Sequence, residues 1–188
     1  HEVSALKHDL FSWAEDLKRQ GDKETFDRLQ KIMAVLFDDV PDMHYEGEMK
    51  PADILVSTGT ASADREALIA EAKKYLGVPY AWAGNDPSGF DCSGYTSFIY
   101  KNAGKELPRR AADQYAGCRK LKEKSVQKGD LVFFDNGSGI SHVGIIISDP
   151  GNPKVMIHSS SSKGIIITDI EKSDYWTKRI AGYGAFLD

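Results

Sequence analysis

The sequence has only two cysteines, Cys92 and Cys118, among its 188 residues. Two cysteines are too few for the disulfide framework of a small secreted domain. No apolar run reaches the roughly 20 residues that a membrane-spanning helix needs, so we expect no direct membrane insertion. The chain shows no signal peptide and begins with His1 instead of methionine, so we expect any signal or anchor to precede it.

A strong excess of charge is also absent. The 24 Lys and Arg residues nearly balance the 28 Asp and Glu residues, which leaves a net charge of −4. This balance gives no bulk attraction to nucleic acid, so we expect no nucleic-acid partner. The hydrophobic content of 41% and charged content of 28% are those of a globular protein, and the length suits one domain plus an appendage.

The chain divides into three parts by pattern. Residues 1–40 are predicted to form a helical hairpin, because apolar side chains recur at helical spacing in two stretches that Gly21 separates. The hairpin either packs against the main domain or is the remnant of a larger upstream domain. Residues 41–61 have no sustained period and are rich in turn-forming residues, which predicts a linker in which only 53–56 could be extended. Residues 62–188 form the main domain.

The main domain changes period along its length. Helical spacing predicts a helix over 62–76, a second helix that starts at Cys92, and a helical turn over 107–114 that begins with proline. Five short apolar runs bounded by turn residues then predict strands at 131–134, 142–147, 154–159, 164–170 and 181–187. Helices followed by a meandering set of strands indicate an α+β domain, with the helices packed on a mainly antiparallel sheet of about five strands.

Cys92 is the first candidate for chemistry. It follows a stretch rich in glycine and proline and opens a run with helical spacing. A cysteine at a helix N-terminus faces unpaired backbone N–H groups and the positive end of the helix dipole, which both favour the nucleophilic thiolate. The alternative is a small buried apolar residue, which is how most lone cysteines behave.

Two histidines supply possible partners for this thiol. His142 begins one predicted strand and His158 lies near the end of the next, so an antiparallel pairing can bring them together on one face. A cysteine nucleophile needs such a base and a group that orients the base. A zinc site fits poorly, because Cys92 has no second ligand at the usual spacing and Cys118 lies far from either histidine. We therefore expect neither a metal nor an organic cofactor.

Five blocks in one order resemble the NlpC-type bacterial cell-wall cysteine peptidases of the papain-like superfamily. The resemblance extends over about residues 62–188, and the blocks are Gly77–Gly84, Phe90–Gly94, Leu107–Arg109, Gly129–Phe134 and Ser141–Ile145. It implies a papain-like fold and cleavage of peptidoglycan stem peptides, typically between γ-D-glutamyl and a diamino acid. It also implies a bacterial protein that is secreted or held in the cell envelope.

The resemblance also implies roles for single residues. By position, Cys92 matches the nucleophile, His142 the base, and His158 the polar residue that orients the base. The matching substrate-binding positions are Tyr80, Trp82, Asp91 and Ser93, of which Tyr80 could also help to bind the oxyanion. One departure is that Ala83 stands where a second glycine is common after the tryptophan, and we expect this to have little effect.

Two other functions remain open on the sequence. Papain-like folds also use cysteine and histidine for amide hydrolysis or acyl transfer on other substrates. The domain could instead be a wall-binding module with an inactive site, although the presence of Cys92, His142 and His158 argues against this. The sequence does not decide the oligomeric state, the exact stem peptide or the role of residues 1–61.

Overall fold

The structure is a computed structural model that describes residues 62–188 and 47–49, together with some of the residues between 9 and 29. Most of the predicted hairpin and the predicted extended piece at 53–56 lie outside the described residues. No helix within the described part of the chain is long and apolar enough to cross a membrane.

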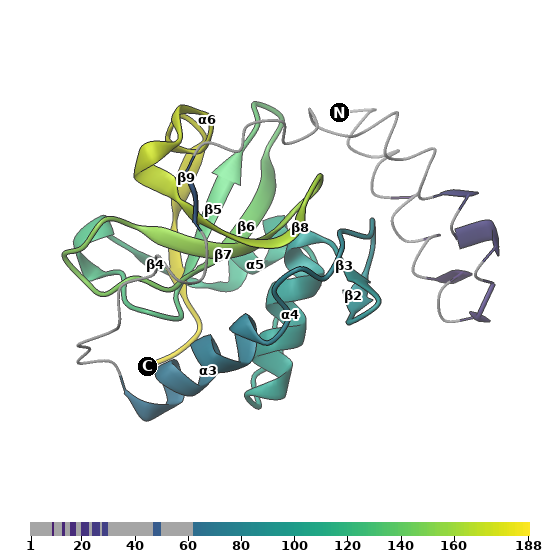
Figure 1. Ribbon diagram of the computed structural model, residues 1–188, viewed down its shortest axis with the longest axis horizontal. Helices are drawn as coiled ribbons and strands as arrows, with labels where there is room; N and C mark the ends of the chain where they lie inside the picture. Colours follow the sequence, from purple (N-terminus) through teal and green to yellow (C-terminus); the bar gives the residue numbers. More distant parts are fainter. Residues whose placement is uncertain are drawn as a thin grey trace.

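A seven-stranded antiparallel sheet forms the centre of the domain (Figure 1). In spatial order its strands are β1 (Glu48–Met49), β8 (Gly164–Asp169), β7 (Val155–Ser160), β6 (Ile140–Ile146), β5 (Leu131–Asp135), β9 (Ile180–Ala185) and β4 (Arg119–Leu121). All five predicted strands are confirmed. The two edge strands were not predicted, because two or three residues are too short to show an alternating pattern. β1 lies within residues 41–61, and the assignment of these residues as a linker stays a prediction.

Helices α3 (Ala63–Lys73) and α4 (Cys92–Asn102) begin within one residue of their predicted starts. Helix α3 starts after Ser62, whose side chain accepts a hydrogen bond from the Arg65 N–H. Short elements complete the domain: β2 (Asn85–Asp86), β3 (Gly89–Phe90), α5 (Ala111–Gly117), α6 (Asp174–Thr177), and the 3₁₀ turns η2 (Glu123–Ser125) and η3 (Ile170–Lys172).

The predicted helical turn over 107–114 is only partly correct, because α5 begins at Ala111 instead of directly after Pro108. The residue before the helix, Arg110, is extended with φ −101° and ψ 150°. The Pro108 carbonyl accepts a hydrogen bond from Gln114 Nε2 at 2.8 Å. This bond ties the backbone of the 107–110 segment to a side chain of α5, and the segment therefore does not extend the helix toward its N-terminus.

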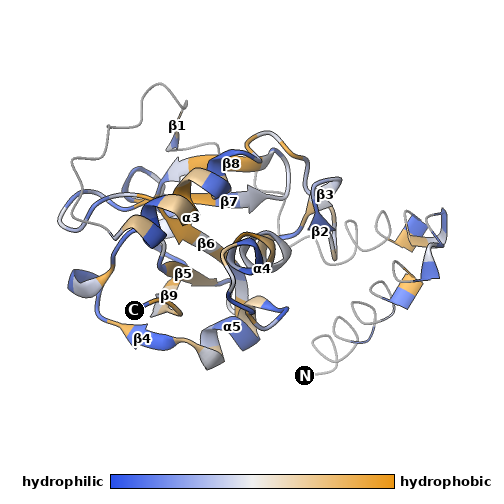
Figure 2. Cartoon of the chain, turned by 90° about the horizontal axis from the view of Figure 1, so that it is seen from below, coloured by the Kyte–Doolittle hydropathy of each residue, from blue (hydrophilic) through white to orange (hydrophobic). Residues whose placement is uncertain are grey.

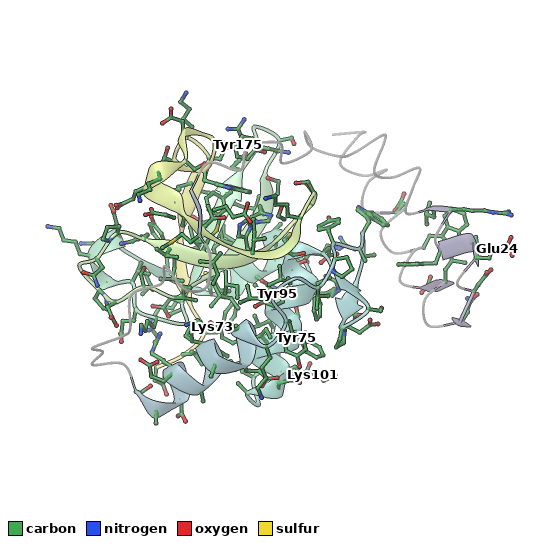
Figure 3. The ribbon with its side chains drawn as sticks, viewed as in Figure 1. Glu24, Lys73, Tyr75, Tyr95, Lys101 and Tyr175 are labelled. Atoms are coloured by element: carbon green, nitrogen blue, oxygen red, sulfur yellow. The ribbon has the colours of Figure 1, made fainter. Side chains whose placement is uncertain are left out.

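Apolar side chains fill both faces of the sheet. On one face α3 and α4 cover a core that includes Leu68, Tyr95 and Val143, and the helical layer lies against this face in Figure 2. On the other face, Trp176 of α6 packs on a second core with Phe134. Figure 3 shows Tyr95 and Tyr175 on opposite sides of the sheet. Because side chains alternate between the two faces of the sheet along each strand, the strands contribute residues to both cores.

A buried ion pair fixes the helical layer to the sheet. The Arg65 guanidinium lies 2.8 Å from the Asp130 carboxylate and 2.8 Å from the Lys128 carbonyl, and both side chains of the pair are almost fully buried. Tyr95 of α4 adds a hydrogen bond to the Ala72 carbonyl of α3 at 2.7 Å. Because a buried charge needs its partner, these contacts specify how α3 and α4 sit beside β5.

The described residues of the N-terminal segment contact the loop that precedes α4. Leu17, Phe26 and Leu29 form a buried cluster with Ala83, and Trp82 packs against it. Ala83 has a left-handed backbone with φ 59°, a conformation that normally favours glycine. The alanine methyl group that replaces the common glycine is therefore buried in this cluster. These contacts agree with the alternative in which the hairpin packs against the main domain.

Candidate active site

Cys92 is the first residue of α4, as the sequence predicts. The preceding residue, Asp91, caps the helix: its carboxylate accepts a hydrogen bond from the Gly94 N–H at 2.6 Å. The Asp91 N–H in turn donates to the Gly84 carbonyl at 2.9 Å. The glycine- and proline-rich loop is thus tied to the start of the helix, which fixes the position of the thiol.

Gly94 is required at this junction by close packing, since its backbone conformation is ordinary. A Cβ atom at position 94 would lie far inside van der Waals distance of the Gly84 carbonyl oxygen and 2.8 Å from the Asp91 carboxylate. Both obstacles are fixed, one as backbone and the other as the helix cap. The first turn of α4 can therefore approach the loop this closely only with glycine at position 94.

We expect Gly94→Ala to destabilise the domain by about 1–3 kcal/mol, because overpacking at this site must move backbone. The shift should also displace Cys92 and lower activity. Chemical denaturation of the variant, with the alkylation rate of Cys92, measures both effects. The matched control is Gly117→Ala in α5, where a Cβ has no neighbour closer than 3.7 Å. Equal stability of the two alanine variants would contradict this explanation.

The thiol lies where two strands of the sheet separate. β6 pairs with β7 only over its last two residues, so the first part of β6 has no β7 partner. Cys92 Sγ lies 3.8 Å from the carbonyl oxygen of Ser141 in this part of β6, and the Val143 backbone N–H acts to lower the pKa of the thiol. Ser159 of β7 also bonds to this part of the chain, through the Phe90 carbonyl at 2.8 Å. The thiol is therefore held against the backbone on both sides of His142.

The predicted meeting of His142 and His158 is confirmed. His142 Nε2 and His158 Nδ1 are 2.8 Å apart, and His158 Nε2 is 2.9 Å from Thr168 Oγ1. Gly144, two residues after His142, makes this diagonal contact possible. A Cβ there would lie 3.3 Å from the His158 Cβ and 2.7 Å from Met156 Sδ. The absence of a side chain at position 144 leaves the space that the His158 ring uses to reach His142.

Aromatic rings enclose the two imidazoles. Trp176 has its ring centroid 4.7 Å from that of His142 and 5.3 Å from that of His158, and Phe134 lies 5.8 Å from His142. The sequence reasoning assigned no role to Trp176 or Thr168. The only sequence feature that could have pointed to Thr168 is its position as a polar residue within the apolar run of β8. For Trp176 the only such feature is its size.

Burial sets the charge state of the site without substrate. Burial raises the pKa of the Cys92 thiol to about 12, and the Asp91 carboxylate adds to the rise. Burial lowers the pKa of His142 to about 3, and burial together with His142 holds the pKa of His158 well below its usual range. The helix N-terminus alone would favour a thiolate, but here burial outweighs it, so the resting pair is a neutral thiol and a neutral imidazole.

The fully buried His158 and the partly buried His142 should make the protein sensitive to acid. An unfolded histidine titrates near pH 6.5, whereas the folded state keeps both rings neutral to lower pH. Above pH 6.5 both states are neutral, so stability is complete there. As the pH falls below 6.5, the unfolded chain binds protons that the folded chain does not bind. We expect each histidine to reduce the free energy of unfolding by about 1.4 kcal/mol per pH unit.

The measurement for this prediction is denaturant unfolding between pH 7.5 and pH 5. In a variant that carries both His142→Gln and His158→Gln, stability should change little over this range, because neither glutamine titrates. If wild type and the double variant lose stability with the same slope, the histidines are not the source of the acid sensitivity.

Asp91 and Ser93, predicted to hold the substrate, are engaged within the protein. Arg109 Nη2 lies 2.9 Å from one Asp91 carboxylate oxygen, and Arg109 Nη1 lies 3.0 Å from the other and 3.0 Å from Ser93 Oγ. Asp91 is only 4% exposed. The structure thus gives both residues a role in fixing the start of α4, and substrate contact by them stays a prediction. Arg109 belongs to the third quoted block but received no predicted role.

Tyr80 and Trp82 lie on the loop that leads to Cys92. Tyr80 forms an isolated bridge with Phe90, which places its backbone beside the residues directly before Cys92. Trp82 is half-buried against the cluster that contains Ala83. Their substrate-binding roles also stay predictions. No group of three or more histidine, cysteine or carboxylate side chains in the described part of the chain is arranged to hold a metal ion.

Comparison with known proteins relates this geometry to a family. The NlpC/P60 family model matches residues 77–185, which include the cysteine, both histidines and the whole of the sheet except its β1 edge. The chain is 45% identical over 117 residues to a probable endopeptidase p60 of Listeria monocytogenes, and this match covers 62% of the chain and 23% of the relative.

Two further matches come from Bacillus cereus, one curated sequence and one solved structure. A γ-D-glutamyl-L-lysine dipeptidyl-peptidase is 46% identical over 95 residues, which cover 49% of this chain and 27% of that protein. The crystal structure of an NlpC/P60 family protein superposes with a TM-score of 0.60 at 35% identity, over 69% of this chain and 42% of the other. The matches span between 21% and 36% of the length of the curated relatives. The fold is thus a papain-like α+β fold, and the chain belongs to the NlpC/P60 family.

Proposed function

We propose that this domain is a cysteine peptidase that hydrolyses peptidoglycan stem peptides. The observation that carries the proposal is the position of the Cys92 thiol beside the backbone of Ser141 and Val143, the two neighbours of His142 in β6. The His142–His158 contact of 2.8 Å then supplies the base and its orienting group. Nucleophile, base and orienting group thus come from one helix start and two adjacent strands.

The proton movements follow from the neutral resting pair. As the Cys92 sulfur attacks the scissile carbonyl carbon, its proton passes to His142, and the Cys92 backbone N–H at the helix start stabilises the oxyanion. His142 then gives this proton to the leaving amine when the C–N bond breaks. Water, deprotonated by His142, hydrolyses the thioester and restores the thiol. His158 stabilises the transient imidazolium of His142 by accepting a hydrogen bond from its Nε2–H.

The proposed scissile bond joins γ-D-glutamate to the diamino acid of the stem peptide. The support is similarity: one relative is named for γ-D-glutamyl-L-lysine and another as an endopeptidase. A wall substrate would require a secreted or envelope location, and that location forms part of the proposal. Tyr80 and Trp82 are the side chains that we propose line the substrate path, because both precede Cys92 on the same loop.

The test is a digest of purified peptidoglycan followed by mass spectrometry of the released fragments. The proposal predicts fragments with a new amino terminus on the diamino acid and a new carboxylate on γ-D-glutamate. Release of a different amide bond would support the alternative of an amidase with another specificity. A folded protein that binds peptidoglycan and releases nothing would support the alternative of a wall-binding module.

A further inference from the structure

The hydrogen-bonded line of the site does not end at the second histidine. It continues from His158 Nε2 to Thr168 Oγ1 at 2.9 Å, so it crosses the adjacent strands β6, β7 and β8. Thr168 is 2% exposed and His158 is fully buried. Within the described residues, the only hydrogen bond of the Thr168 hydroxyl is to His158. A threonine in a run of isoleucines thus has its one polar atom directed at a buried imidazole.

The number of protons on the two imidazole rings limits which hydrogen-bond directions are possible along this line. If His142 takes the thiol proton on Nδ1, it becomes an imidazolium, and its Nε2 must donate a hydrogen bond to His158. His158 Nδ1 must then be the bare nitrogen, so the single proton of the neutral His158 ring lies on Nε2. That Nε2–H faces Thr168. Only an acceptor at Thr168 satisfies the buried Nε2–H of His158 in the charged state of the site.

The opposite arrangement would block the proposed base. If the Thr168 hydroxyl donated to His158 Nε2, the proton of His158 would lie on Nδ1 and would point at His142 Nε2. His142 Nε2 would then have to accept, which puts the His142 proton on Nδ1. With its proton already on Nδ1, the His142 ring has no bare Nδ1 nitrogen to take the proton of the thiol. The direction of the Thr168–His158 hydrogen bond therefore decides whether His142 can take the proton of the thiol.

We propose that Thr168 is a positioning residue whose hydroxyl oxygen accepts a hydrogen bond from the Nε2–H of His158 and so selects the tautomer that lets His142 act as base. This inference rests on the proposed function and extends the Cys92–His142–His158 line by one group. Thr168 touches neither the substrate nor the thiol, so it acts only through His158. The hydroxyl of serine can replace it, whereas the equally sized valine cannot.

The first test compares kcat/KM on a stem peptide for Thr168→Val, Thr168→Ser and Thr168→Ala. We expect valine and alanine to lower kcat/KM roughly 5- to 150-fold with little change in KM, because a buried N–H is left without an acceptor. Serine should restore most of the activity. Thr177→Val in α6 is the control, because that hydroxyl bonds only to backbone carbonyls. If Thr168→Val keeps wild-type kcat/KM, or if serine does no better than valine, the inference is overturned.

The second test reads the tautomer without activity, by nitrogen-15 NMR of the histidine rings, assigned with His142→Gln and His158→Gln. We expect the His158 proton on Nε2 in wild type and Thr168→Ser, and a shift toward Nδ1 in Thr168→Val. A wild-type ring protonated on Nδ1, or no change in the valine variant, would overturn the inference. If wild type cleaves no stem peptide, the proposed function fails while this measurement still decides the role of Thr168.

Discussion

Cys92→Ala is expected to lower stem-peptide hydrolysis by at least about 10⁴-fold, which corresponds to about 5.4 kcal/mol of transition-state stabilisation. The reason is that the attack on the carbonyl has no nucleophile once the sulfur is removed. The fold should persist, because Cys92 is only half-buried and its helix cap is made by Asp91. The measurement is product formation by mass spectrometry on a defined stem peptide, together with the thermal unfolding midpoint of the variant.

Cys118→Ser is the matched control for this prediction. Cys118 is the other thiol of the chain, and its sulfur lies 3.2 Å from the Tyr115 carbonyl oxygen. It packs beside Gly184, away from both histidines. We expect the serine variant to remain active. If both variants stay folded and lose activity equally, the assignment of Cys92 as nucleophile is wrong.

The second large effect is expected at the two histidines, where the kind of substitution should matter. His142→Gln removes the base and should lower kcat/KM about 10³- to 10⁴-fold. His158→Ala should lower it roughly 10- to 1000-fold, because His142 loses the acceptor that stabilises its imidazolium. His158→Gln and His158→Asn should retain substantial activity, since a side-chain amide offers a permanent acceptor oxygen.

The measurement is kcat/KM on one defined stem peptide for all four variants, with the stability of each determined separately. Burial of His158 makes this control necessary, because alanine there leaves a cavity as well as an unpaired His142 nitrogen. The amide variants separate the two effects, because they fill the space and keep an acceptor. If a folded His158→Ala matches wild type, another group orients His142.

Much of the fold follows from local patterns in the sequence. Short apolar runs separated by turn residues correspond to the strands β5 to β9. Ser62 and Asp91 cap the helices that follow them. The edge strands could not be predicted, because their pairing depends on neighbours that lie more than 60 residues away in the sequence. β4 pairs with the C-terminal β9, and β1 pairs with β8.

The candidate site was predictable in outline and not in its electrostatics. The spacing of His142 and His158 predicted their contact, and the helix start predicted the location of Cys92. The charge state depends on how deeply the groups are buried, which involves Trp176 of a four-residue helix. Local sequence favoured a thiolate, whereas tertiary burial favours the neutral pair. In the same way, the Arg109 contact to Asp91 depends on two loops meeting in space.

The most direct measurement is cleavage of two synthetic stem peptides, one with lysine and one with diaminopimelate after γ-D-glutamate, by wild type and Cys92→Ala side by side. The account predicts that wild type hydrolyses the γ-D-glutamyl bond of at least one peptide, and that the alanine variant releases no fragment from either. Cleavage by the alanine variant at the wild-type rate, or no cleavage of either peptide by the folded wild type, would contradict it.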